Sequence, residues 1–151
     1  MITIDVIKKL REKTSAGVME CRKALEETKG DTKKAEELLA KWGIEKSEKK
    51  ADRETKAGII ESYVHGGKAG VLLELLCETD FVARTDDFKN LAHELCLQIV
   101  SMRPKDVKTL LGQEYIRDPK LKIADLVKQT IGKLGENITV SRFTRLALGE
   151  K

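Results

Sequence analysis

Aromatic residues are scarce in this sequence. Only 4% of its 151 residues are Phe, Trp or Tyr, whereas 36% carry a charge. A hydrophobic core built from such a chain must be mainly aliphatic. The length is sufficient for one domain of ordinary size, or for a small domain beside a modest core.

Long apolar runs are also absent. None approaches the roughly 20 residues that a membrane-spanning helix needs, and the N-terminal stretch MITIDVIKKL lacks the features of a signal or transit peptide. The three cysteines, Cys21, Cys77 and Cys96, are widely spaced and form no CxxC pair, which is typical of reduced thiols. We therefore expect a cytoplasmic protein that contacts no membrane. A matrix or plastid protein without its presequence would look the same.

The sequence has no strong excess of either charge. Its 29 basic and 25 acidic residues leave a net charge of +4, and both signs are interleaved along the chain. Proteins that bind nucleic acid usually gather basic side chains into a stripe that neutralises phosphates. Interleaved charges are typical of solvated faces. We therefore expect no direct binding to nucleic acid.

Residues 1–44 are predicted to form a helical domain of three short helices. Thr3 and Asp31 are typical N-caps for the first and third helices, while Gly30 and Gly43 are typical of residues that follow a helix end. A core of this size is marginally stable by itself. The apolar residues that recur at helical spacing are Val6, Ile7 and Leu10, then Val18, Cys21, Ala24 and Leu25, then Ala35, Leu38, Leu39 and Trp42.

A charged linker is predicted over residues 45–57, because this segment has almost no apolar face. It can be a solvated helix with ion pairs or a flexible tether. An α+β core domain is predicted over residues 58–151. Its first two strands, near 59–65 and 70–76, are separated by HGGK, which favours a hairpin. The second strand is apolar on both faces, so we expect it to be central and covered.

Two helices are predicted to pack on this sheet. The first starts at Asp86 or Asp87 and ends before Pro104, and the second spans residues 122–134 and is closed by Gly135. The segment between them is expected to be mainly irregular. The last segment, NITVSRFTRLALG, is β-like without clean alternation, which indicates a bulge or an edge position. The predicted fold class is α+β: a three-helix bundle followed by a small antiparallel sheet with packed helices.

Residues suited to metal or covalent chemistry are few. His93 and Cys96 lie three apart on one predicted helix face, but a structural zinc needs four ligands and no second pair is visible. Cys77 and His65, on neighbouring strands, can form a thiol–imidazole pair. No glycine-rich nucleotide-binding motif is present. The residues therefore predict no metal site and no enzyme.

The stretch CETDFVARTDDF places Phe81 among polar neighbours directly after an apolar strand. Phe88 already fits the core stripe of the next helix, so Phe81 is either folded back into the core or presented to a partner. The adjoining carboxylates of Glu78 and Asp80 can also form an acid–base pair. Met19 is a second candidate for partner contact, or else a cover for the small helical core.

Three motifs in register resemble the elongation factor Ts family. The stretch LREKTSAGVMECRKALEETKGDTKKAEELLAKWG resembles the N-terminal helical module of that family, a fold of the ubiquitin-associated type. ETDFVAR resembles the family's TDFVA loop. LGENI, followed by a basic β segment with Arg142 and Arg145, resembles its C-terminal motif. The resemblance covers nearly the whole chain.

The resemblance implies a guanine-nucleotide exchange factor for elongation factor Tu that uses no cofactor and performs no covalent chemistry. The TDFVA loop is implied to enter the partner's G domain and to disturb its Mg²⁺ and phosphate site, so that GDP leaves and GTP can bind. The implied contact residues fall in three groups: Thr79, Asp80, Phe81 and Val82 in the loop, Arg11, Val18 and Met19 in the helical domain, and His65 in the core.

The chain departs from the family pattern in length. Typical members carry additional core sequence and a helical insertion, where this chain has only RPKDVKTLLGQEYIRDPKLK. Short members are expected to complete the binding surface by pairing, so we expect a homodimer. Val18 stands where methionine is frequent in the family, which is a modest apolar exchange. The alternative hypothesis is a protein-interaction module that uses the helical bundle and promotes no exchange.

Overall fold

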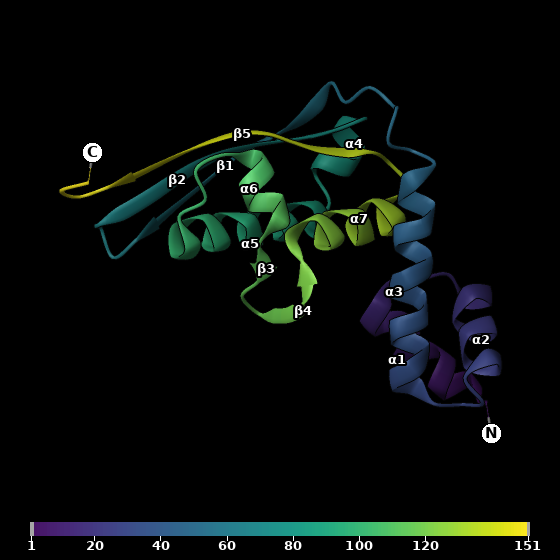
Figure 1. Cartoon of the computed structure of the whole chain (residues 1–151). Coiled ribbons are helices and arrows are strands. Elements are labelled where there is room, and N and C mark those ends of the chain that lie inside the picture. Colours follow the sequence, from purple (N-terminus) through teal and green to yellow (C-terminus); the bar gives the residue numbers. More distant parts are fainter. Residues whose placement is uncertain (1, 151) are drawn as a thin grey trace.

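The computed structural model describes residues 2–150, which form a helical head joined to an α+β core (Figure 1). The α+β prediction is confirmed. The head contains α1 (Ile4–Thr14), α2 (Val18–Glu27) and α3 (Thr32–Glu48). The core contains β1 (Ala57–His65), β2 (Ala69–Cys77), α4 (Asp80–Ala83), α5 (Asp86–Met102), α6 (Val107–Gly112), β3 (Glu114–Tyr115), β4 (Asp118–Lys122), α7 (Ile123–Leu134) and β5 (Ile138–Ala147).

The head helices begin where the sequence predicts. The Thr3 side chain accepts a hydrogen bond from the Val6 N–H, and the Asp31 side chain accepts one from the Lys34 N–H. Both bonds satisfy backbone donors that the first turn of a helix leaves free. The head has its own small core of buried residues: Leu10, Cys21, Ala24, Leu25, Ala35 and Leu39.

The third helix does not end at Gly43, which corrects the prediction from sequence. It continues to Glu48 and crosses α7 at close range, because Gly43 faces Gly132. A Cβ atom placed on Gly132 would lie 2.5 Å from the Gly43 carbonyl oxygen. The two backbones can therefore touch only because Gly132 lacks a side chain, whereas a Cβ atom on Gly43 would lie 3.8 Å from its nearest neighbour, the Gln129 carbonyl oxygen. Gly43 lies inside α3 at this crossing and does not stop the helix.

The core sheet is antiparallel with the strand order β1-β2-β5. The predicted hairpin is confirmed: Gly66 and Gly67 have positive φ angles, and the Lys68 N–H donates to the His65 carbonyl. The prediction that the second strand is central is also confirmed. Strand β5 occupies an edge, and its register with β2 shifts between Glu74 and Leu75, as its irregular alternation predicts.

Only one face of the sheet is covered, so the expectation that the second strand is covered on both faces is wrong. Helices α5 and α7 lie along the inner face (Figure 1), where Leu73 and Leu75 are fully buried with Phe88. On the outer face Leu72 is 55% exposed. The sequence alone could not distinguish a strand covered on one face from a strand covered on both, because the outer residues of this strand are as apolar as core residues. The exposed apolar residues of the outer face are Ile60, Val64, Leu72 and Leu146.

The segment predicted as irregular contains regular structure. Helix α6 and the β3–β4 hairpin occupy residues 107–122, and the hairpin projects from the core (Figure 1). The fully buried Gln98 side chain donates to the Glu114 carbonyl and accepts from the Ile116 N–H. Short elements of this kind depend on such a distant side chain, which local periodicity does not reveal.

The chain between α3 and β1 is bound to the core. The buried Asn137 side chain donates to the carbonyls of Ala51 and Arg53, and Thr55 Oγ1 bonds to Thr139 Oγ1. Division into domains 1–44 and 58–151 with a linker at 45–57 stays a prediction. No helix within residues 2–150 is long and apolar enough to cross a membrane.

Candidate functional site

The segment after β2 presents a phenylalanine on a single helical turn. Helix α4 has Thr79 as its N-cap, and the Thr79 hydroxyl accepts from the Val82 N–H. The Phe81 side chain is 87% exposed, whereas Val82 and Ala83 are buried against the core. A large apolar side chain on a solvent-exposed surface is a candidate for burial in a partner protein. We call residues 79–83 the α4 turn.

A side chain from the far end of the chain holds the α4 turn. The Glu136 carboxylate accepts two hydrogen bonds from Thr79, one from the backbone N–H at 3.0 Å and one from the hydroxyl at 2.7 Å. The Cys77 thiol donates to the Thr79 carbonyl at 3.2 Å. Sequence reasoning missed Glu136 as part of this site. The only signal was its place in LGENI, where a polar residue follows the helix-ending Gly135.

The four residues predicted in this loop are together, but they differ in exposure. Asp80 and Phe81 are exposed, and Thr79 is exposed at the start of the turn. Val82 is 9% exposed and lies within the core cluster. The Val82 side chain therefore belongs to the core, and the exposed residues of the turn are Thr79, Asp80 and Phe81.

The three residues predicted in the head lie on α1 and α2, near the loop that joins them. Arg11 is exposed, and Met19 is 73% exposed. Val18 was expected in the apolar stripe of its helix, but it is the first residue of α2 and is 46% exposed. Cys21, one turn later, is fully buried instead. Val18 and Met19 thus form an exposed apolar pair.

His65 lies far from the α4 turn along the sheet. It pairs with Ala69 at the hairpin end of β1, whereas Cys77 pairs with Ala57 at the other end. The structure therefore excludes the proposed Cys77–His65 pair. His65 is exposed, and its Nδ1 lies 2.9 Å from the hydroxyl oxygen of Tyr63.

The other residues considered for covalent catalysis or metal binding are not arranged for either. Burial raises the pKa of the Cys77 thiol, and it raises the pKa of the Cys96 thiol to about 12, so neither favours the nucleophilic thiolate. His93 is exposed and packs edge-on against Tyr63. Glu78 pairs with Arg53. Within residues 2–150, no three His, Cys, Asp or Glu side chains are grouped to hold a metal ion.

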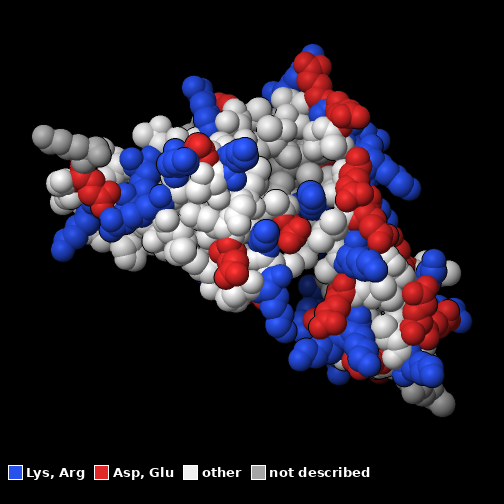
Figure 2. All heavy atoms as spheres, in the orientation of Figure 1, with Lys and Arg blue, Asp and Glu red and all other residues white. Residues whose placement is uncertain are grey.

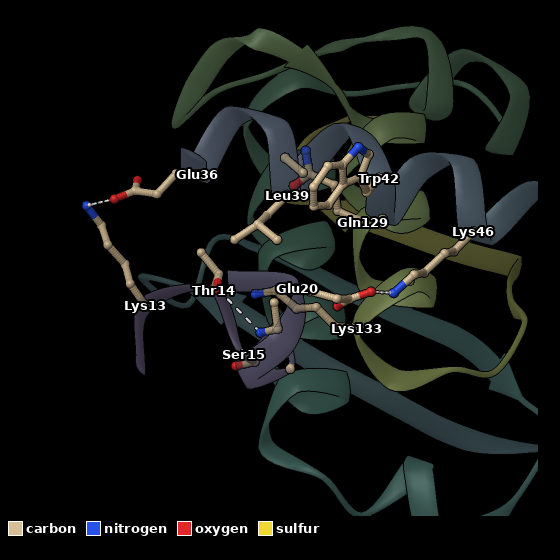
Figure 3. Close-up of a pocket in the computed structure, with 15 residues that line it drawn as sticks. Lys13, Thr14, Ser15, Glu20, Glu36, Leu39, Trp42, Lys46, Gln129 and Lys133 are labelled. Atoms are coloured by element: carbon tan, nitrogen blue, oxygen red, sulfur yellow. Dashed lines mark hydrogen bonds and ion pairs between the residues drawn. The ribbon is translucent and has the colours of Figure 1, made fainter. Parts of the chain in front are cut away.

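A cavity of about 420 Å³ lies where the head meets the core (Figure 3). It is lined by the α1–α2 loop, α3 and α7. Ion pairs at its rim join Lys13 to Glu36 and Lys46 to Glu20, so much of its charge is already neutralised. The surface as a whole also mixes both charges (Figure 2). This mixture gives no basic stripe on the face shown, as the sequence indicates.

Taken together, these features are typical of the class of proteins that act by binding another protein. A helical head carries an exposed Val18–Met19 pair, and an α+β core presents Phe81 on a turn held from two sides. The chain belongs to the elongation factor Ts family, as its comparison with known proteins shows. Its family role lies in the elongation step of translation.

The family model for elongation factor TS matches residues 78–151. The elongation factor Ts of Thermotoga neapolitana is 44% identical over 194 positions, which cover 99% of this chain and 98% of that protein. The one from Coprothermobacter proteolyticus is 43% identical over 195 positions, with 99% of each chain covered. Because these alignments are longer than the 151 residues here, the relatives contain sequence that this chain lacks.

Proposed function

We propose that this chain binds elongation factor Tu in its GDP form and promotes release of GDP, so that GTP can bind. The proposal is supported above all by Phe81, which is 87% exposed on a turn whose neighbours are buried or hydrogen-bonded. Membership of the elongation factor Ts family supports the choice of partner.

The α4 turn would act by competition with the nucleotide. A GTPase holds its nucleotide through backbone donors around the phosphates and through Mg²⁺. Insertion of Phe81 beside this site would displace side chains that support the Mg²⁺ ligands, while Asp80 supplies polar contacts at the rim. Val18, Met19 and Arg11 would hold the head on the same G domain, and His65 would contact a second domain. Because binding free energies are reciprocal, GDP must weaken binding of this chain by the same factor.

No step in this mechanism makes or breaks a covalent bond. The rate enhancement would come from binding free energy alone, and the chain would be released unchanged when GTP binds to its partner.

The decisive experiment is stopped-flow release of a fluorescent GDP from elongation factor Tu. We expect strong acceleration by the wild type and a loss of about 2 kcal/mol or more, roughly thirtyfold in rate, for Phe81→Ala. Met102→Ala is a matched control, because Met102 is also a partly exposed apolar residue but lies at the end of α5. Acceleration that survives Phe81→Ala would disprove the role of this side chain. Absence of acceleration by the wild type would disprove the exchange function.

We further propose that the binding unit is a homodimer. The open face of the sheet carries Leu72 and Leu146, which are 55% and 74% exposed. Glu74 and Arg142 form an ion pair on the same face. In a dimer with a two-fold axis, the Glu74 of each copy can therefore lie near the Arg142 of the other. The chain also lacks sequence that its relatives contain, and a second copy would supply additional surface.

A further inference from the structure

We infer that Glu136 is the residue that positions Phe81 for insertion into the partner. This inference rests on the proposed function, and it concerns a residue outside the α4 turn. Glu136 lies in the turn between α7 and β5, and it is 57 positions away from Thr79 in sequence. Its carboxylate is nevertheless the group that receives both polar hydrogens of Thr79.

The two hydrogen bonds set the direction of the Thr79 hydroxyl. Because this hydroxyl donates to Glu136, a lone pair of its oxygen is left to accept from the Val82 N–H at 3.3 Å. The chain of bonds therefore runs from Glu136 through Thr79 to the backbone of α4. Bonds to an ionised carboxylate are stronger than bonds between neutral groups.

A helix of four residues needs such support. Helix α4 contains only Asp80–Ala83 and has too few internal hydrogen bonds to be stable alone. Val82 and Ala83 hold one side of it by burial, which fixes its distance from the core. The bond to Glu136 holds its N-terminal end, which fixes its rotation. Since Phe81 lies between these two points, its exposed side chain is held in one direction before the partner arrives.

Preorganisation of this kind lowers the entropy that binding must remove. The contribution of Glu136 would appear in the rate of GDP release even though its side chain touches no nucleotide. Glu136→Ala removes both acceptors. Glu136→Gln keeps them in part, because its amide oxygen can accept from the Thr79 N–H while its amide nitrogen donates to the hydroxyl oxygen.

The test compares Glu136→Ala and Glu136→Gln in two backgrounds, the wild type and Phe81→Ala, by release of fluorescent GDP from elongation factor Tu. We expect Glu136→Ala to slow release at least about tenfold in the wild type, and Glu136→Gln to stay within about threefold. In the Phe81→Ala background we expect a change of less than about twofold, because Glu136 acts through Phe81. An equal loss in both backgrounds would show a direct partner contact or a general structural role and would overturn the inference.

Hydrogen–deuterium exchange of the free chain provides a second readout that requires no partner. Glu136→Ala should increase exchange at the Val82 and Ala83 amides at least about tenfold and leave the amides of β2 unchanged. Unchanged protection of α4 would overturn the inference. If the wild type does not accelerate GDP release from elongation factor Tu, the proposed function fails. The hydrogen–deuterium exchange measurement alone then decides whether Glu136 holds the α4 turn.

Discussion

Single polar side chains hold the parts of this molecule that have little core of their own. Gln98 bonds to the β3–β4 hairpin, Asn137 to the segment after α3, and Glu136 to the α4 turn. Each bond closes a contact between residues far apart in sequence. Removal of such a side chain leaves backbone donors or acceptors without partners, which costs about 1–3 kcal/mol when they are buried.

Glu74 gives a residue-scale prediction about pH. The pKa of its carboxyl is lowered chiefly by the hydrogen bond from Ser141, which partial burial opposes, while Arg142 lowers it further. A carboxyl with a lowered pKa in the folded state stabilises the fold above its unfolded pKa of 4.5, and this contribution is lost as the pH falls through the folded value.

Glu74→Gln should therefore lower the melting temperature at neutral pH, and the difference from the wild type should shrink as the pH falls below 4.5. Thermal unfolding followed by circular dichroism over this pH range measures both quantities. A difference that stays constant with pH would show that the charge of Glu74 does not contribute to stability.

At the scale of elements, the crossing of α3 and α7 decides how the head sits on the core. Gly132 faces the backbone of Gly43, so the helix axes approach more closely than side chains would allow. The Trp42 side chain lines the adjoining cavity together with Gln129 (Figure 3). The relative position of the exposed Met19 and Phe81 therefore depends on the absence of a side chain at Gly132.

Gly132→Ala should destabilise the molecule, although the same exchange in an exposed helix usually stabilises it by about 1 kcal/mol. The new Cβ would lie 2.5 Å from the Gly43 carbonyl oxygen, and the helices must separate to relieve the overlap. We expect a loss of about 2 kcal/mol in the free energy of unfolding, within the range for overpacked sites. Urea titration measures it. The matched control is Gly112→Ala in α6, where a Cβ meets no atom within 4 Å. An equal effect of both changes would contradict the close crossing.

At the scale of the whole molecule, the sheet has one covered and one open face. A three-stranded sheet with an apolar outer face is exposed to association, and two such faces can pack as a sandwich. The apolar side chains of Ile60, Leu72 and Leu146 stay exposed on this outer face. A second copy could cover the outer face without moving the head or the α4 turn. The head and the α4 turn lie at the end of the sheet opposite to the end of β5 that carries Leu146 (Figure 1).

Leu72→Glu tests the homodimer, because it places a charge in the centre of the open face. An unpaired charge buried in an interface costs about 3 kcal/mol or more, which weakens the dimer at least about a hundredfold. Sedimentation velocity over a concentration series should show a dimer for the wild type and a monomer for Leu72→Glu. Met102→Glu, which changes a similarly exposed residue of α5, should remain dimeric. A wild type that stays monomeric at all concentrations would disprove the homodimer.

Much of the architecture follows from local patterns. The caps Thr3 and Asp31, the Gly66-Gly67 hairpin and the irregular last strand are each read from a few neighbouring residues, and the structure confirms them. Phe81 could be singled out in the same way, since polar neighbours surround it. These features depend on hydrogen bonds and steric limits within one turn or one strand, so a short stretch of sequence contains their cause.

Other features arise only when distant segments meet. Gly43 looks like a helix end until Gly132 lies against it, and β2 looks covered on both faces until the helices are seen on one. Glu136 is an ordinary turn residue until β2 and β5 pair and bring it to Thr79. The sequence by itself determined the helical head, the two long core helices and the three strands of the sheet, and it singled out Phe81 without deciding whether that side chain is buried or exposed. Tertiary structure decided which face of the sheet stays open and which carboxylate holds the α4 turn. The physical reason is that the local sequence pattern is compatible with several long-range contacts, and only the packing of distant segments selects one of them.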